Sequence, residues 1–184
     1  MTDRLRHVND FELRKFDPAF AALVAGWVQT PEELFMLAPA TEPPLTADKV
    51  LAWTEARNLP LLLWPIGGDA PVGYSELNFM SHDARDLWIG HFIVPESSRG
   101  KGFGYAFMRL LLRRAFASLS AASVSLVVFP ENEVAVNCYL KCGLVKDGIH
   151  VKGFRHLPGK YKMRKMKISS RQYRRWQTRF RSID

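Results

Sequence analysis

The chain has 184 residues, of which 47% are hydrophobic and 24% are charged, and it contains two cysteines. A chain of this length buries roughly 70% of its unfolded surface on folding, so it needs no disulfide or metal to hold its core together. The high hydrophobic content and the low cysteine count exclude the disordered and the disulfide-rich classes of protein. No apolar run approaches the ~18 residues that span a bilayer, and no apolar segment follows the charged start. We therefore expect one cytoplasmic domain without membrane contact.

The net charge of +8 is concentrated near the C-terminus. Residues 131–184 carry 14 of the 26 lysines and arginines and four of the 18 acidic residues. No acidic residue lies between Asp147 and Asp184. A field of this kind attracts anions, so the last third of the chain is a candidate surface for an acidic partner.

The first 59 residues predict one strand and three short helices. Residues 11–16 alternate between apolar and polar, as a half-buried strand does. Asp17 and Thr30 each precede a proline, which is typical of a helix start, so we expect helices over 19–28 and from residue 31. After a proline-rich stretch, residues 46–57 favour a third helix.

The rest of the chain predicts six more strands and three more helices. Residues 61–66 and 72–79 form a hairpin pattern around a glycine-rich turn, and 86–94 follow as a third strand. A helical stripe then leads to a buried-type strand over 124–129 and to a helix over 132–141, which Gly143 ends. Residues 144–154 and 160–168 predict two final strands before a basic helix over 170–181. This order indicates a mixed α/β domain without internal repeats or linkers.

A glycine-rich turn joins the strand that ends at Val94 to the following helix; it reads Arg99-Gly100-Lys101-Gly102-Phe103-Gly104. Such a turn aims backbone N–H groups and the positive end of a helix at a phosphate. The Rossmann pattern does not fit, because its third glycine position is Tyr105, and the P-loop pattern occurs nowhere. Taken alone, the turn is equally typical of a tight strand-to-helix connection with a basic surface.

The R-x-x-G-x-G pattern of this turn resembles the GNAT superfamily of acetyl-CoA-dependent N-acetyltransferases. A second block of that family lies at the expected distance and contains Asn132, Ala135, Tyr139, Lys141 and Gly143-Leu144. The resemblance covers about residues 60–150 and identifies the chain as a member. It implies transfer of an acetyl group from acetyl-CoA to an amine of a small molecule or protein, by direct attack in a ternary complex.

The resemblance also implies a fold and a role for each of three segments of the chain. We expect a single domain with a mixed, mostly antiparallel sheet of about six to seven strands, flanked by helices and splayed after the fourth strand. Residues 1–59 would form the acceptor side, 60–150 the acetyl-CoA-binding core, and 151–184 the terminal strands and the basic helix.

Site residues follow from the same resemblance. The main chain of Phe92, Ile93 and Val94 would pair with the pantetheine arm, and Asn132 would contact the cofactor. The amides of the turn would hold the pyrophosphate; they belong to Arg99, Gly100, Lys101, Gly102, Phe103 and Gly104. Tyr139 would protonate the departing thiolate, a role that a phenol facing the strand end is able to fill. The alternative for Tyr139 is a simple core residue.

The general base is not obvious, because the strand positions where the family often carries glutamate hold Trp88 and Val127 here. The candidates are Glu76 on the neighbouring strand, His91, Asp86, or a water held by carbonyls. We choose Glu76, whose alternative is a solvated strand residue. Strand alternation would point His91 to the face opposite Gly90 and Phe92, which favours a packed structural histidine. The lack of a strong base favours an acceptor amine of low pKa.

Two further features leave alternatives open. Cys138 and Cys142 lie one helical turn apart, but without a second pair of ligands we interpret them as buried thiols and expect no metal. In the last helix Tyr173, Trp176 and Phe180 alternate with arginines, which predicts either a docked amphipathic helix or a surface for nucleic acid. The competing function is thus a binding protein, associated with nucleic acid or the ribosome, with weak or no catalysis. The sequence leaves open whether the chain forms a homodimer.

Overall fold

The computed structural model describes residues 8–54, 57–80 and 85–180. The charged start of the chain and the end of the predicted basic helix, Arg181, lie outside these ranges. Within them the strands are β1 (Phe11–Lys15), β2 (Asn58–Pro65), β3 (Gly73–Phe79), β4 (Asp86–Ile93), β5 (Ser123–Val128), β6 (Val145–Lys152) and β7 (Tyr161–Ser169). The α-helices are α1 (Ala21–Gly26), α2 (Pro31–Leu37), α3 (Ala47–Ala52), α4 (Phe103–Arg113), α5 (Glu133–Lys141) and α6 (Ser170–Phe180). Short turns of other helix types cover Val8–Asp10, Pro18–Phe20, Glu96–Ser98 and Arg114–Ser118.

The predicted helix starts form as their chemistry indicates. Asp17 accepts a hydrogen bond from the amide of Ala19, and Thr30 accepts one from the amide of Glu33. In both places a proline occupies the first helical turn, where its missing N–H costs nothing. The third helix is shorter than expected and ends at Ala52, because β2 already begins at Asn58.

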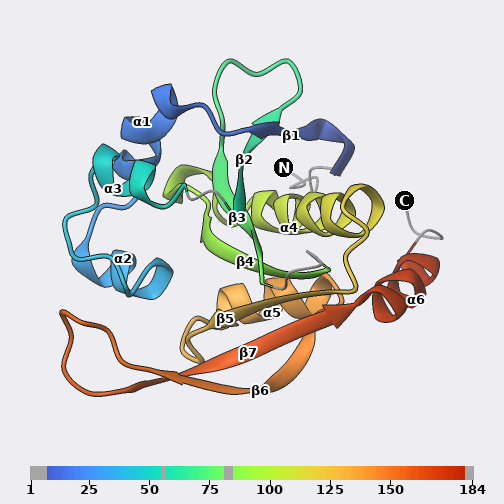
Figure 1. Cartoon of the computed structure of the whole chain (residues 1–184). Helices are drawn as coiled ribbons and strands as arrows, with labels where there is room; N and C mark the ends of the chain where they lie inside the picture. The colour runs from blue at the N-terminus through green and yellow to red at the C-terminus, as the bar shows by residue number, and fades with distance from the viewer. Residues whose placement is uncertain (1–7, 55–56, 81–84, 181–184) are drawn as a thin grey trace.

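The seven strands form one sheet in the order β1-β2-β3-β4-β5-β7-β6 (Figure 1). Only β4 and β5 are parallel; the other neighbours in the described sheet are antiparallel. The helix α4 connects the parallel pair, as a crossover between parallel strands requires. These observations confirm the predicted mixed, mostly antiparallel sheet.

The parallel pair separates halfway along its length. Pairing of β4 with β5 runs from Asp86 with Ser123 to Trp88 with Ser125. Beyond that point β4 continues to Ile93 and β5 to Val128 without further pairing between them. The backbone groups on this edge of β4 therefore have no strand partner in the described sheet, which confirms the predicted splay.

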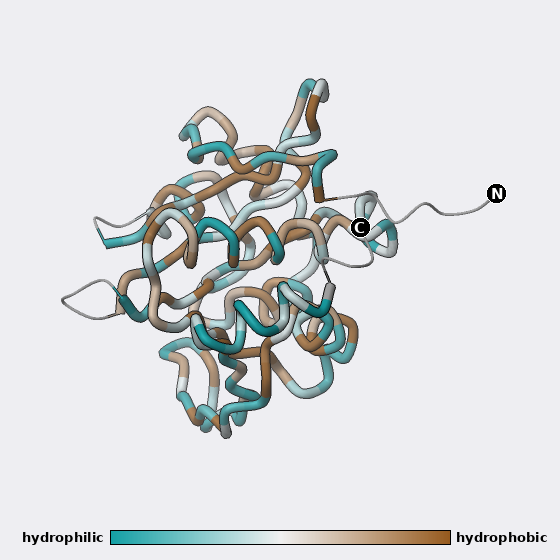
Figure 2. Tube along the Cα trace, turned by 90° about the vertical axis from the view of Figure 1, so that its right-hand side faces the viewer, coloured by the Kyte–Doolittle hydropathy of each residue, from teal (hydrophilic) through white to brown (hydrophobic). Residues whose placement is uncertain are grey.

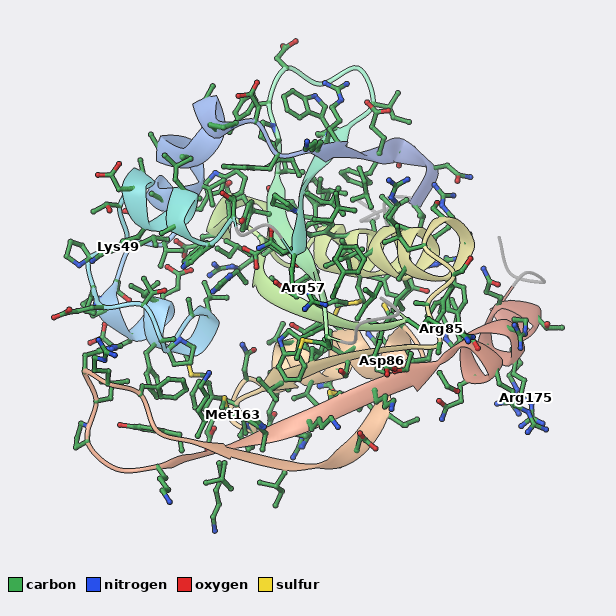
Figure 3. The ribbon with its side chains drawn as sticks, viewed as in Figure 1. Lys49, Arg57, Arg85, Asp86, Met163 and Arg175 are labelled. Carbon is green, nitrogen blue, oxygen red and sulfur yellow. The ribbon has the colours of Figure 1, made fainter. Side chains whose placement is uncertain are left out.

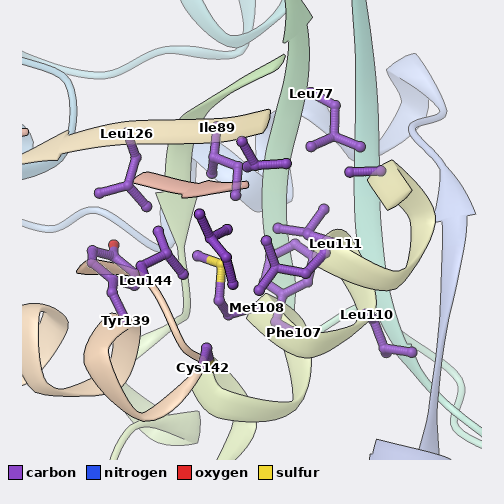
Figure 4. Packing of buried hydrophobic residues seen from close by; sticks show 14 of the residues in the cluster. Leu77, Ile89, Phe107, Met108, Leu110, Leu111, Leu126, Tyr139, Cys142 and Leu144 are labelled. Atoms are coloured by element: carbon purple, nitrogen blue, oxygen red, sulfur yellow. The ribbon is translucent and has the colours of Figure 1, made fainter. Parts of the chain in front are cut away.

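Two hydrophobic clusters divide the sheet into an α4 face, packed against α4 and α5, and an α1 face, packed against α1 and α3. Along β2, Leu61 and Leu63 belong to the first cluster, whereas Leu62 and Trp64 belong to the second. Side chains that alternate in this way bury both faces of the strand. Figure 2 shows hydrophobic and hydrophilic residues interleaved along the chain. Figure 4 shows the core of the α4 face, where side chains of α4 and α5 meet those of the strands.

A β-bulge interrupts this alternation in β4. Tyr74 pairs with Ile93 and Glu76 with Gly90, so one residue of β3 opposes two of β4. The two residues of β4 in this bulge are His91 and Phe92. The φ of His91 is 39°, which lies in the left-handed region. As a result Gly90 and His91 share the α1 face, and the predicted placement of His91 opposite Gly90 is wrong. Its placement opposite Phe92 is correct.

The basic helix α6 packs against the domain through its aromatic side. Tyr173 is buried and stacks on Phe116, and Trp176 donates a hydrogen bond to the carbonyl of Lys141. The ring of Trp176 lies so close to Gly143 that a Cβ there would meet it at 2.8 Å. The helix is therefore part of the fold, and its arginines lie on the remaining surface.

Candidate active site

The glycine-rich turn leads from the end of β4 into the first turn of α4. The amides of Ser98 and Arg99 bond to the carbonyls of Pro95 and Glu96, whereas Gly100 and Gly102 adopt φ values of 71° and 80°. The first amides of α4 have no helical acceptor, because a helix leaves its first N–H groups unpaired. A Cβ on Gly100 would meet open space, so the turn is accessible. Main-chain donors at the positive end of an 11-residue helix fit a pyrophosphate.

The two basic side chains of the turn bond to protein groups. Arg99 donates from Nε to the carbonyl of Val94 at 2.9 Å and forms an ion pair with Glu33 of α2. Lys101 donates to the carbonyl of Ser97 at 2.7 Å. Phosphate binding would thus rest mainly on the amides. The link between Arg99 and Glu33 escaped sequence reasoning, since the two residues are 66 positions apart and no local pattern joins them.

The second family block places Tyr139 at the splay. Asn132 caps α5 by accepting a hydrogen bond from the amide of Ala135 at 3.1 Å. One turn further on, the ring of Tyr139 is 6% exposed and lies edge-on to Phe92, with 5.8 Å between ring centroids. Figure 4 shows its hydroxyl oxygen directed toward the strands, and it makes no hydrogen bond to another described residue. Two residues predicted from separate blocks, Phe92 and Tyr139, are therefore in contact.

The surroundings of Tyr139 keep its hydroxyl protonated. Burial raises the pKa of Tyr139 well above its ordinary value, and the neighbouring Cys138 and Cys142 raise the pKa further. The phenol is therefore a proton donor throughout the neutral and mildly alkaline range. It fits the predicted role of supplying a proton to a leaving group.

Glu76 lies on the α1 face of β3 and is 1% exposed, so its interpretation as a solvated strand residue is wrong. Its carboxylate accepts a hydrogen bond from the hydroxyl of Tyr74 at 2.6 Å. Both of its oxygens lie 2.9 Å from Nδ1 of His91. A Cβ on Gly90 would come within 2.8 Å of Oε2. The glycine thus makes room for the carboxylate beside the edge of β4 that β5 has left.

Aromatic residues enclose this carboxylate. Burial first, and then the charge of Glu76, raises the pKa of Tyr74, so its hydroxyl remains a donor to Glu76. The ring of His91 stacks on Trp53 with 4.0 Å between centroids and 10° between planes. Trp53 is itself fixed by a hydrogen bond to Thr41. Sequence reasoning selected Glu76 but missed its partner Tyr74, two residues earlier on β3, and Trp53, which stacks on His91 from the end of α3.

The other positions considered for a base are less suitable. Asp86 lies at the start of β4, where the hydroxyl of Ser123 donates to it at 2.5 Å, before the strands separate. Trp88 is the last residue of β4 that pairs with β5. Val127 lies on β5 beyond that pair and packs against a third cluster, which contains Met163 of β7 (labelled in Figure 3). Only Glu76 brings a carboxylate to the separated part of β4 in the described structure.

The cysteines form no metal site with other residues. Cys142 is buried, and burial raises the pKa of its thiol, whereas Cys138 is half-buried rather than fully buried as expected. Within the described ranges no group of three or more histidine, cysteine or acidic residues is placed to hold a metal ion. No helix in those ranges has the length and apolar character needed to cross a membrane.

A cavity of about 360 Å³ lies apart from these groups. It is lined by residues around α2 and the segment that follows it, namely Val28, Gln29, Thr30, Pro31, Leu34, Pro43, Pro44 and Leu45. None of these residues belongs to the glycine-rich turn, to the surroundings of Glu76 or to Tyr139. The cavity is therefore not the place where a phosphate or an attacking amine would meet the groups described above.

Comparison with known proteins agrees with this arrangement. The sequence model of the Acetyltransferase (GNAT) family matches residues 27–144. Among solved structures, the spermidine N-acetyltransferase from Vibrio cholerae in complex with CoA and spermine is 20% identical, with a TM-score of 0.74 over 90% of this chain and 98% of that one. A chimera of that enzyme with hSSAT has a TM-score of 0.71 at 20% identity, over 89% and 98% of the two chains. The spermidine/spermine N-acetyltransferase from Vibrio cholerae in complex with manganese ions has a TM-score of 0.68 at 20% identity, over 91% of this chain and 97% of that one.

The chain belongs to the GNAT acetyltransferase family, because the family match covers most of its length and both of its sequence blocks. The structural likeness shows the same fold. The protein is an N-acetyltransferase, and its reaction is acetyl transfer to an amine acceptor.

Proposed function

We propose that the acetyl donor is acetyl-CoA and that the amine attacks it directly in a ternary complex. The observation that carries this proposal is the convergence of three features at one point of the sheet. The free edge of β4 ends at Phe92 and Ile93, and Val94 follows beside the first turn of α4. A Cβ on Gly104 in that turn would lie 3.9 Å from the ring of Phe92, which contacts Tyr139.

Each part of the donor then has a matching protein group. The main chain of Phe92, Ile93 and Val94 would pair with the amides of the pantetheine arm, as an added strand does. The pyrophosphate would be held by the amides of residues 100–104, since the amide of Arg99 already bonds to the carbonyl of Glu96. Asn132 would act near the cofactor by fixing the start of α5, on which Tyr139 lies. Acetyl-CoA supplies a thioester whose sulfur leaves as the amine bonds to the carbonyl carbon.

The protein's own groups move the protons of this reaction. Tyr139, which burial keeps protonated, would protonate the sulfur. Glu76 and His91 form one acid–base unit on the opposite face of β4 and would receive the proton of the amine. The sequence favoured an acceptor amine of low pKa because it lacked an obvious base. With Glu76 and His91 as the proposed base, that reason no longer applies.

The division of the chain follows from the same geometry. Residues 1–59 supply α1, α2 and α3, which cover the α1 face where His91 and Glu76 lie. Residues 60–150 supply the separated strands, the turn and Tyr139. Residues 151–184 complete the sheet with β7 and add α6. We propose that the acceptor enters from the α1 face, and spermidine is the first amine to test because similar structures are of spermidine N-acetyltransferases.

Binding of acetyl-CoA is expected to raise the melting temperature by about 5 to 10 °C. A ligand at 100 times its dissociation constant adds about 2.7 kcal/mol of stability, and a chain of this size melts about 2 to 4 °C higher for each kcal/mol. The measurement is a thermal melt with and without millimolar acetyl-CoA, with adenosine as the control that lacks the pyrophosphate and pantetheine. A melt that acetyl-CoA leaves unmoved would contradict the donor assignment. A panel of amines, followed by release of the CoA thiol, then tests transfer.

A second function, binding of nucleic acid, is favoured by the surface of α6. Its aromatic side is docked, whereas Arg171, Arg174, Arg175 and Arg179 are all exposed on one 11-residue helix. Arginines grouped in this way neutralise successive phosphates. The catalytic groups lie elsewhere, so this binding would accompany acetyl transfer rather than replace it.

Replacing these four arginines with glutamine is expected to lower the salt concentration at which the protein leaves heparin or RNA. The matched control removes four exposed charges from separate parts of the fold, at Lys15, Arg113, Lys146 and Lys160. Removing four charges that act together on one binding surface weakens retention more than removing four charges at separate positions. If the two variants elute at the same salt concentration, the four arginines serve only to keep the protein in solution.

A further inference from the structure

We propose that His91 accepts the proton of the attacking amine, and that Glu76 is a positioning residue that holds the imidazole. This inference rests on the proposed acetyl transfer and names the group that serves as its base. It differs from the expectation from sequence, in which Glu76 takes the proton and His91 only packs.

Access separates the two residues. A base must come within about 2.6 to 3.2 Å of the proton that it removes, or reach it through one water. The side chain of Glu76 is 2% exposed, and its oxygens are occupied by Tyr74 and His91. The side chain of His91 is 25% exposed. Of the pair, only the imidazole has surface that a substrate reaches.

Hydrogen bonding prepares the imidazole for this role. The carboxylate of Glu76 only accepts hydrogen bonds, so the proton of the neutral ring stays on Nδ1, which donates to it. The lone pair then lies on Nε2, at the edge of the ring directed away from Glu76. A carboxylate behind an imidazole both fixes the tautomer and stabilises the imidazolium that forms. The donor from Tyr74 completes the partners of the carboxylate.

Packing and backbone geometry aim the ring. His91 occupies the bulge of β4 with a φ of 39°, a conformation that non-glycine residues adopt at a cost. Such strained residues cluster at functional sites, and bulges re-aim side chains. The ring lies flat on Trp53 at 4.0 Å, which prevents rotation and favours a cation over its face. A histidine that only filled space would not need this arrangement.

The bulge also places the base and the acid on opposite sides of one strand. His91 faces the α1 side, whereas the next residue, Phe92, faces the α4 side and contacts Tyr139. Both residues lie on the part of β4 that β5 has left. An amine that enters from the α1 face therefore meets His91 before it reaches the gap, and a leaving sulfur on the far side meets Tyr139.

The proton balance is complete with these two groups. The amine nitrogen bonds to the carbonyl carbon and loses a proton to Nε2 of His91. The carbon–sulfur bond breaks, and the sulfur takes a proton from the hydroxyl of Tyr139. The imidazolium and the tyrosinate return to their starting forms by exchange with solvent, so one proton has passed from nitrogen to sulfur.

The test compares His91→Gln with His150→Gln in the full-length protein, using an alkylamine that the wild type acetylates. His150 is the matched control, because it is half-buried and lies near Trp88 on the same face of the sheet. His91→Gln is expected to lower kcat/KM by 10² to 10⁴-fold, the usual contribution of a general base. The melting shift with acetyl-CoA should stay unchanged. His150→Gln should retain kcat/KM within about threefold, the ordinary scatter of remote changes.

The pH profile distinguishes the base from a merely structural histidine. With His91 as the base, kcat/KM of the wild type falls as the pH is lowered, because the protonated ring no longer accepts a proton. The titratable groups placed against His91 are Glu76 and, through it, Tyr74, both on β3. Trp53, which follows the end of α3, packs on the ring without a titratable group. His91→Gln should remove this acid limb, and Glu76→Gln should keep it while lowering the rate. An acid limb that persists in His91→Gln and disappears in Glu76→Gln would overturn the proposal in favour of Glu76.

A second variant keeps the test decisive if glutamine disturbs the fold. His91→Ala leaves a space on Trp53, and added imidazole is expected to restore at least tenfold of the lost rate with an acid limb of its own. No restoration in a variant that still shows the acetyl-CoA melting shift would count against His91 as the base. If the wild type acetylates no amine although acetyl-CoA binds, the proposed function itself fails, and this inference fails with it.

Discussion

Replacing Tyr139 with phenylalanine is expected to lower kcat about 100-fold while the affinity for acetyl-CoA hardly changes. The ring keeps its packing against Phe92 and loses only the hydroxyl, which makes no hydrogen bond to another described residue. Removing it therefore leaves no partner unsatisfied. The measurement is kcat together with the melting shift that acetyl-CoA produces. Tyr161→Phe is the control, because that tyrosine packs on the terminal hairpin beside Phe154.

The pH dependence makes this result specific to proton donation. A thiol with a pKa of about 8.5 needs a proton less as the solution becomes alkaline. Burial raises the pKa of Tyr139, so the wild-type donor stays protonated over the same range. The defect of Tyr139→Phe should therefore shrink between about pH 7 and pH 9.5, provided that chemistry limits turnover at both. A loss that is independent of pH would assign Tyr139 to positioning the thioester, and wild-type kcat at every pH would dismiss its role.

Replacing Gly102 with valine is expected to abolish the melting shift with acetyl-CoA. Gly102 caps α4 with a φ of 80°, and the left-handed region costs an L-residue roughly 1 to 2 kcal/mol, more when the residue is β-branched. The turn would relax away from this geometry, and the amides would no longer converge on the pyrophosphate. The side chain would also keep the main chain from a close approach to the anion.

The control for this change is Gly67→Val. Gly67 has a φ of 74° and open space around its Cβ position, and it lies in the connection between β2 and β3. It therefore carries the same backbone strain away from the turn. Both variants should melt below the wild type, and only Gly67→Val should regain stability with acetyl-CoA. A full shift in Gly102→Val would remove the turn from the binding site.

The elements and the glycine-rich turn were predictable because their signals are local. Helix starts at Asp17 and Thr30 depend on a side chain that bonds an amide two or three residues away. The turn depends on glycines at alternate positions, two of which, Gly100 and Gly102, adopt positive φ. Tyr139 was found through the block in which it stands, and its contact with Phe92 agrees with the role that the resemblance implies. The acetyltransferase family was thus determined by the sequence alone.

The contacts of the proposed acid–base unit were decided only by the tertiary structure. Glu76 and His91 are 15 residues apart on antiparallel strands, and Trp53 reaches them from a helix on the α1 face. Their meeting depends on a bulge that turns His91 to the face of Glu76, and strand alternation predicts the opposite. The pairing of Arg99 with Glu33 spans 66 residues for the same reason. Strand register and helix packing set these contacts, since the direction of a side chain follows from the backbone around it and its partners from the whole fold.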